Sequence, residues 1–342
     1  MSSLKIGVIN WDGCPNSDTT YFGTYSAKSL SNPKYADRIP FYADVAKDGT
    51  ISFHDRTQEE FDTELTYAAE AGIDYFAYVW YTERSVFTEN EPVSETARHV
   101  HELTRIRRLH KNSPKNTTAK MCALLSAHPI TDEELDDLAL TMQESYYQDM
   151  DGRPLVYLFS GYHKELILRL QEACRRAGTP LPYIVPCSEN QPARPGETYD
   201  LADGISAYCI PTDEEDCPTA EDFIRATIEK NSLMLTYPLD MIPMYSAGWN
   251  PSPRVDSPVP WYQYSEKQYA PASQADQLEP RAKAFAQWLQ EKSVKPRHIL
   301  TFAWNEFEEG GFLCPTRFAD GSVNSSNVVA FRRVVDLRKS IF

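Results

Sequence analysis

The 342-residue chain lacks the features that mark several large protein classes. Positive charge is scarce: 34 Lys and Arg stand against 49 Asp and Glu, a formal net charge of −15, which argues against nucleic acid and anionic membranes as partners. No apolar run approaches the ~18 residues of a membrane span, and the N-terminus shows no signal peptide. We therefore expect a cytoplasmic protein, or a periplasmic or secreted one if a leader precedes this sequence.

The sequence also lacks the common motifs of metal, nucleotide and serine-nucleophile sites. Its seven cysteines are odd in number and scattered, without a CxxC pair or a Cys/His ligand spacing, so neither a disulfide framework nor a zinc site is predicted. HExxH, GxSxG and GxxxxGK[ST] are missing, and no GxGxxG follows the first apolar run. We expect no metal and no cofactor, and a neutral substrate fits the charge best.

Eight short apolar runs are present, and most are continuous rather than alternating, as in parallel strands buried on both faces. They span Lys5–Asn10, Asp74–Trp80, Ala119–Leu125, Pro154–Phe159, Tyr183–Pro186, Gly204–Ala207, Met241–Ser246 and His298–Ala303. Because helical patterns alternate with them, the sequence predicts a (β/α)8 TIM barrel, one catalytic domain over residues 1–342. A doubly wound open sheet is the alternative.

The helical patterns have recognisable starts and stops. Capping-box spacings begin two of them, Thr57 with Glu60 and Thr131 with Glu134. The predicted helices span Thr57–Ala71, Val93–His110, Thr131–Gln148, His163–Ala177, Thr219–Lys230, Glu279–Glu291 and Asn327–Arg338. Two long segments without helical periodicity, Cys14–Ser52 and Trp249–Gln277, follow the first and seventh strands. We expect them to be loops over the C-terminal face of the barrel.

The most informative segment is LTFAWNEFEEGGFLCP, residues 300–315. A buried strand ends there in an aromatic, an amide and three carboxylates, at the place where barrel enzymes build their active sites. Glu306 and Glu309 are predicted to be the catalytic pair, because glycosidic cleavage needs one carboxyl group to donate a proton and another to act as base or nucleophile. Glu308 is expected to point to solvent, and a plain acidic turn is the alternative for the whole segment.

Aromatic, hydroxyl and acidic side chains stand at the predicted tips of the other strands. The chain has 20 Tyr, 15 Phe and 6 Trp, and aromatic rings bury the flat faces of sugars. The residues predicted to bind an oligosaccharide or polysaccharide are Trp11, Asp12, Trp80, Tyr81, His128, Tyr208, Tyr245, Trp249, Arg254, Trp304 and Asn305.

Several of these segments match one family. WNEFEEGGFLCP resembles the WNEW-x-EG segment of glycoside hydrolase family 99, the endo-α-mannosidases, and of the related WbsX-like proteins found with polysaccharide biosynthesis genes. EAGIDYFAYVWY at 70–81, DGRPLVYLF at 151–159 and SAGWNPSPR at 246–254 are similar to further segments of these proteins. The resemblance covers most of the chain, from about the second strand to the eighth.

The resemblance implies a retaining α-glycosidase on a (β/α)8 barrel. By motif position, Glu306 would act as base on the sugar 2-hydroxyl, which displaces the leaving group. Glu309 would protonate the leaving oxygen and later activate water, with Trp304 and Asn305 orienting the pair. The chain departs from the family at Glu308, where the mannosidases commonly have His, and an added negative charge there would raise the pKa of Glu309, which suits a proton donor.

Two other functions remain open from the sequence. A glycosyltransferase of polysaccharide biosynthesis would need a diphosphate site, and the acidic cluster at 213–216 is more typical of a solvated loop. A non-catalytic carbohydrate-binding barrel would have no need of the paired acids.

Overall fold

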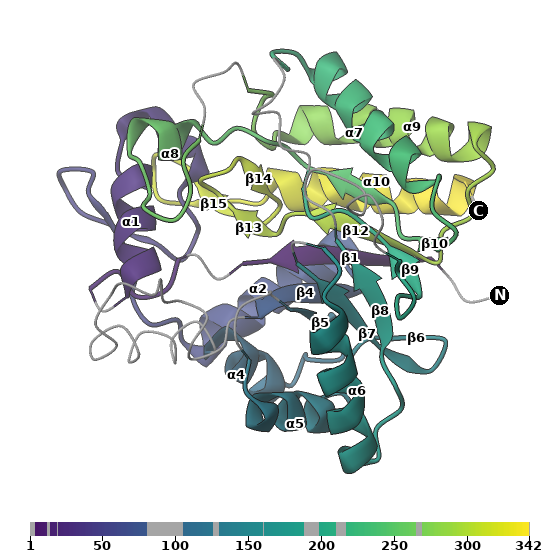
Figure 1. Ribbon diagram of the computed structural model, residues 1–342. Helices are drawn as coiled ribbons and strands as arrows, with labels where there is room; N and C mark the ends of the chain where they lie inside the picture. Colours follow the sequence, from purple (N-terminus) through teal and green to yellow (C-terminus); the bar gives the residue numbers. More distant parts are fainter. Residues whose placement is uncertain are drawn as a thin grey trace.

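The computed structural model describes residues 4–11, 14–18, 20–80, 105–125, 130–159, 161–187, 198–209, 217–264 and 269–341. These residues form the predicted (β/α)8 barrel, a curled parallel sheet surrounded by helices (Figure 1). No helix within these ranges is both long enough and apolar enough to cross a bilayer.

Parallel pairing joins most of the barrel strands in the order β11-β12-β1-β4-β5-β7-β8. Shorter contacts close the circle: Cys187 bridges to Ser206 just after β9, and β9 pairs in parallel with β10, which leads directly into β11. The barrel strands are β1 (Lys5–Asn10), β4 (Tyr75–Trp80), β5 (Lys120–Leu125), β7 (Arg153–Leu158), β8 (Tyr183–Pro186), β9 (Gly204–Ile205), β10 (Asp240–Met241), β11 (Met244–Ser246) and β12 (His298–Phe302). All eight predicted strands are found at their predicted places.

Helices pack around this sheet, and short hairpins extend from its ends. The helices are α1 (Tyr21–Leu30), the 3-10 helix η1 (Pro33–Arg38), α2 (Gln58–Ala71), α4 (Arg105–Asn112), α5 (Asp132–Thr141), α6 (Lys164–Ala177), α7 (Ala220–Met234), α8 (Ser252–Asp256), α9 (Ala275–Glu291) and α10 (Ser326–Ile341). The short strands are β2 (Asp44–Val45), β3 (Ile51–Ser52), β6 (Asp149–Met150), β13 (Asn305–Glu306), β14 (Gly311–Phe312), β15 (Thr316–Arg317) and β16 (Val323–Asn324).

The local signals in the sequence account for several helix ends. Both capping boxes form: the Thr57 and Thr131 hydroxyls accept from the backbone N–H three residues on, and Glu60 and Glu134 bond back to the cap. Both predicted loops are wrong in part, because Cys14–Ser52 contains α1 and η1, and Trp249–Gln277 contains α8 and the start of α9. Thr20 caps α1 by accepting from Gly23 N, and the helix lies against β3, η1 and α8.

The barrel interior contains a polar chain near its N-terminal end. The Tyr75 hydroxyl lies 2.7 Å from the Tyr157 hydroxyl and 3.2 Å from His298 Nδ1. The Tyr75 ring lies over Gly7 so closely that a Cβ there would come within 2.1 Å of it, so only glycine fits at this point of β1. Burial lowers the pKa of His298 to about 4, and the imidazole is therefore neutral at physiological pH.

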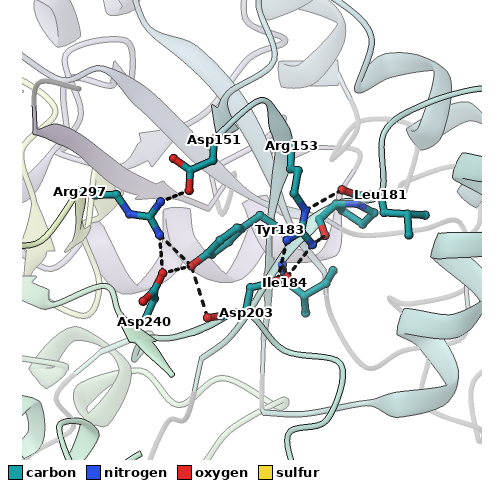
Figure 2. A network of polar contacts seen from close by, with 9 residues as sticks. Asp151, Arg153, Leu181, Tyr183, Ile184, Asp203, Asp240 and Arg297 are labelled. Carbon is teal, nitrogen blue, oxygen red and sulfur yellow. Dashed lines mark hydrogen bonds and ion pairs between the residues drawn. The ribbon is translucent and has the colours of Figure 1, made fainter. Parts of the chain in front are cut away.

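A network of charged and tyrosine side chains joins several barrel strands (Figure 2). Among them are β9 and β10, whose backbones pair over only two residues. Arg153 at the start of β7 binds Asp203 with two nitrogens, at 2.6 and 2.8 Å. Arg297, just before β12, pairs with Asp151 and Asp240, and the Tyr183 hydroxyl donates to Asp240 at 2.8 Å. We call these six residues the basal network. It ties β7, β8, β9, β10 and β12 together at the N-terminal mouth of the barrel.

Candidate active site

The acidic segment forms a tight hairpin at the C-terminal end of β12. Glu306 lies on β13, which pairs with β14, and Glu308 and Glu309 lie in the turn between them. Gly310 closes the turn at φ +76°, where a Cβ would also come within 2.8 Å of Asn250 N. Asn250 N in turn donates to the Glu309 carbonyl at 2.6 Å. The glycine after the acids therefore lets the turn pack directly on the segment that follows β11.

Glu306 is buried, with 3% of its surface exposed. Its Oε1 accepts a hydrogen bond of 2.8 Å from the Tyr208 hydroxyl. Its Oε2 has no hydrogen-bond partner within the described part of the chain, and Arg254 Nη2 lies 3.7 Å from it. Burial, and secondly the charge of Glu309, raise the pKa of Glu306 well above its usual value. Glu306 is therefore the carboxyl group that favours its protonated form.

Glu309 is held by two donors that approach the same oxygen. Arg254 Nη1 and the Tyr264 hydroxyl both donate to Glu309 Oε1, and Arg254 Nη1 also lies 2.6 Å from the Tyr264 oxygen. Arginine has no acceptor and stays charged, so this contact favours the carboxylate form of Glu309. Within one turn, the two acids therefore occupy different electrostatic environments.

Arg254 is the common partner of all three acids. Its guanidinium is 3% exposed and contacts Glu306, Glu308 and Glu309. Aromatic rings enclose it, with centroid distances of 5.0 Å to Trp11, 5.8 Å to Trp261 and 5.6 Å to Tyr264. Burial alone would lower the pKa of Arg254, but Tyr264 and the three glutamates raise it well above its usual value. The site therefore has a permanently charged centre.

The expectation that Glu308 points to solvent is wrong. Its side chain is 2% exposed. It accepts hydrogen bonds from the hydroxyls of Ser26 and Ser29 on α1, the second at 2.5 Å, and Arg254 Nη2 lies 3.4 Å away. The hairpin turns Glu308 toward α1, which the sequence did not reveal as a helix. Figure 1 shows α1 and α8 beside this hairpin at the C-terminal end of the barrel.

Three further predicted site residues lie around this cluster. The Trp11 ring lies under Arg254, the Tyr208 hydroxyl bonds Glu306, and Trp249 packs against Tyr264 and Phe302. The indole N–H of Trp249 is buried and lacks a hydrogen-bond partner among the described residues.

Four predicted residues have other surroundings. Trp304 is fully buried and donates to Glu64 of α2 at 2.7 Å, and the Tyr245 hydroxyl donates to the Leu278 carbonyl of α9 at 2.8 Å. The Asn305 side chain links the hairpin to β1, where it accepts from Trp11 N at 2.8 Å. Trp80 lies at the tip of β4, with the Arg107 guanidinium 3.7 Å from its ring. In the described part of the chain, no hydrogen bond or ion pair joins any of these four side chains to Glu306 or Glu309.

The remaining predictions lie outside the described residues: Asp12, Tyr81, His128 and the acidic cluster at 213–216.

Sequence reasoning missed Ser26, Ser29, Trp261 and Tyr264. Trp261 and Tyr264 stand in the aromatic stretch WYQY, inside the segment Trp249–Gln277 that was predicted to cover the C-terminal face. That position was the only indication in the sequence that they would lie at the site. In the ranges that the structure describes, no group of three or more His, Cys, Asp or Glu side chains is arranged to hold a metal ion.

Comparison with known proteins identifies the fold. No protein-family model matches the chain, and no curated protein matches it. Among solved structures, a GH99 endo-α-mannosidase from Bacteroides thetaiotaomicron is similar over 99% of this chain and 98% of its own, with a TM-score of 0.57 and 12% identity. The fold is that of the GH99 barrel. A second structure of the mannosidase gives a TM-score of 0.56, with 12% identity and coverage of 99% of each chain.

A GH5_18 protein from Streptomyces cattleya, solved in complex with GlcNAc, is also similar, at a TM-score of 0.51 and 10% identity. It covers all of this chain and 82% of its own. The predicted barrel architecture is therefore confirmed by independent relatives of the fold.

Proposed function

We propose that this chain is a glycoside hydrolase that cleaves an α-linked, α-mannoside-like glycan with Glu306 and Glu309. The observation that carries the proposal is the pair of buried carboxyl groups on one turn at the C-terminal end of a barrel, each with a different set of partners. Shared architecture with a GH99 endo-α-mannosidase supports the substrate class. No cofactor is needed for this chemistry.

The pair carries one proton in the free site. Burial and the charge of Glu309 raise the pKa of Glu306, while Arg254 and Tyr264 both donate to Glu309. Two carboxyl groups whose surroundings push their pKa values apart are the usual basis of an acid and base pair. One proton on two acids is what a glycosidase needs at the start of a turnover.

We assign the base role to Glu306 and the acid role to Glu309 by their positions in the motif. Glu306 would take the proton of the sugar 2-hydroxyl, whose oxygen then displaces the leaving group, and Glu309 would protonate that group. Because the free site holds the proton on Glu306, this assignment requires the proton to move to Glu309 as substrate binds. The total number of protons on the pair does not change.

The groups around the pair suit a neutral sugar. The buried Trp249 N–H and Glu306 Oε2 offer a donor and an acceptor with no protein partner among the described residues. The Trp11 and Trp261 rings flank Arg254 beside them, and aromatic faces of this kind pack on sugar C–H groups. We therefore expect an oligosaccharide or polysaccharide substrate.

The direct test is a screen of α-mannosides and a broad glycan panel, with product anomers followed by proton NMR. Net retention of the anomer is expected. Glu309→Gln should abolish turnover on natural glycosides while the circular dichroism spectrum and ligand binding stay unchanged, and Glu144→Gln on the exposed surface serves as control. Equal activity of the wild type and Glu309→Gln would refute the assignment.

The roles of the two acids are separated by leaving-group chemistry. A glycosyl fluoride needs no protonation to leave, so Glu309→Gln should keep activity on the fluoride that it loses on a natural glycoside. Glu306→Gln should lose both, because the 2-hydroxyl is no longer deprotonated. The opposite pattern would mean that Glu306 is the acid and Glu309 the base.

A further inference from the structure

The catalytic hairpin contains one more buried acid than the reaction needs. Glu306, Glu308 and Glu309 are 3%, 2% and 8% exposed, and Arg254 is the one cation with an ion pair to any of them in the described ranges. If all three acids were ionised, their negative charge would exceed the charge of Arg254 by two in a cluster shielded from water. Such a state is costly, so the cluster retains a proton.

Arg254 divides its contacts between the acids. Its Nη1 donates to Glu309, while its Nη2 faces Glu308 at 3.4 Å and Glu306 at the longer distance of 3.7 Å. The rings of Trp11, Trp261 and Tyr264 surround the guanidinium and restrict its rotation. Glu308 therefore competes directly with Glu306 for the same nitrogen.

Glu308 is fixed on its other side by α1. Ser26 donates to one carboxylate oxygen and Ser29 to the other, so both oxygens are occupied. A hydroxyl can donate to a carboxylate without neutralising it. These contacts hold the negative charge of Glu308 against Arg254 in a defined position.

We propose that Glu308 is a positioning residue that engages Arg254 Nη2 and so keeps one proton on the Glu306–Glu309 pair. The inference rests on the proposed function for its catalytic meaning, but the charge arrangement itself does not depend on any substrate. The charged and titratable groups that face Glu306 are Tyr208, after β9, Arg254 on α8, and Glu308 and Glu309 on its own hairpin. Tyr264 faces the cluster through Glu309.

The test is infrared spectroscopy of the full chain in the absence of substrate, since a protonated carboxyl group absorbs apart from a carboxylate. At neutral pH the wild type should show a protonated-carboxyl band that disappears in Glu306→Gln. In Glu308→Gln the band should titrate about 1 to 3 pH units lower, because Arg254 then acts on Glu306 without a competing charge. Glu308→Asp is the matched control, because it keeps the charge, and its band should titrate near that of the wild type.

Either of two results would overturn the inference. One is a wild type with no protonated carboxyl group at neutral pH, which can be established even if Glu308→Gln fails to fold. The other is a folded Glu308→Gln whose band titrates as in the wild type. The proposed function fails separately: the expected bands with no glycoside cleaved would contradict the enzyme but leave the role of Glu308 intact.

Discussion

The Tyr208 hydroxyl donates a hydrogen bond of 2.8 Å to Glu306 Oε1, and so joins the segment after β9 to the acidic hairpin, residues 305–312, across the mouth of the barrel. The Tyr208 ring packs edge-on against Phe159, with centroids 4.7 Å apart, which fixes the hydroxyl in place. This contact lowers the pKa of Glu306 and partly opposes the effect of burial. This hydrogen bond therefore stabilises the ionised form of Glu306.

We expect Tyr208→Phe to raise the pKa of Glu306 further, because the donor to its carboxylate is lost. Because the proposed reaction needs the proton to leave Glu306 for Glu309, kcat/KM at neutral pH falls about tenfold, and the basic limb of its pH profile, where the pair loses this proton, moves to higher pH by about one unit. Measuring kcat/KM against pH on the best glycoside checks this. Tyr262→Phe, on the exposed Tyr262, is the control, and an unshifted basic limb with unchanged activity in Tyr208→Phe would contradict the role.

Replacing Arg254 should destabilise the fold in a pH-dependent way. Arg254→Met removes the ion pairs of Arg254 with three buried carboxyl groups, which costs about 3–5 kcal/mol at neutral pH. The loss should shrink in acid as the carboxyl groups become protonated. Arg281→Met is a matched control, because Arg281 is also buried but donates to the Ala247 carbonyl instead of an acid. Urea unfolding at several pH values distinguishes the two, and a loss that does not vary with pH would contradict the account.

Two buried histidines should make the fold sensitive to acid. Burial lowers the pKa of His110 and of His298 to about 4, below the ~6.5 of an unfolded chain. Above about pH 6.5 these histidines are neutral in both the folded and the unfolded chain. Between about pH 6.5 and pH 4 they bind protons only in the unfolded chain. The free energy of unfolding therefore falls by up to about 3 kcal/mol per histidine as the pH is lowered through this interval. His110→Gln should flatten the slope of unfolding free energy against pH over this interval, and an unchanged slope would contradict the prediction.

The basal network should contribute to stability without contributing to turnover. Asp203→Ala removes the two-nitrogen contact of Arg153 and the acceptor of Ile184 N at 3.0 Å. Because the Asp203 and Arg153 side chains are about a quarter to a third exposed, with 26% and 37% of their surface accessible, we expect a loss of only about 1 kcal/mol in urea unfolding. The kcat should stay unchanged. Asp132→Ala, which breaks an exposed pair with Arg169, should have a smaller effect on stability.

The sequence was sufficient to predict the barrel because strands buried on both faces are continuous apolar runs. The boundaries of β1 and β8 agree to the residue, and both capping boxes form where Thr and Glu are spaced by three. The predicted site was less complete. Glu306, Glu309 and Arg254 come together, but Tyr245 faces α9 instead.

The residues that were predicted at the site but lie elsewhere were misplaced for one physical reason. A residue at a strand tip can face the mouth of the barrel or the surrounding helices, and a one-residue change in register decides between them. The helix α1 was not predicted, so nothing in the sequence indicated that Ser26 and Ser29 would meet Glu308. Contacts between segments about 280 residues apart depend on the closed barrel and cannot be derived from local patterns.

The basal network also has an evolutionary consequence. It joins barrel strands whose backbones pair over only two residues, at the end opposite the acidic hairpin, so the contacts that close the cylinder lie apart from the proposed site. Under the proposed function, segments around the hairpin would change in length or sequence, and alter which glycan is accepted, while the seam stays closed and thermal robustness is kept.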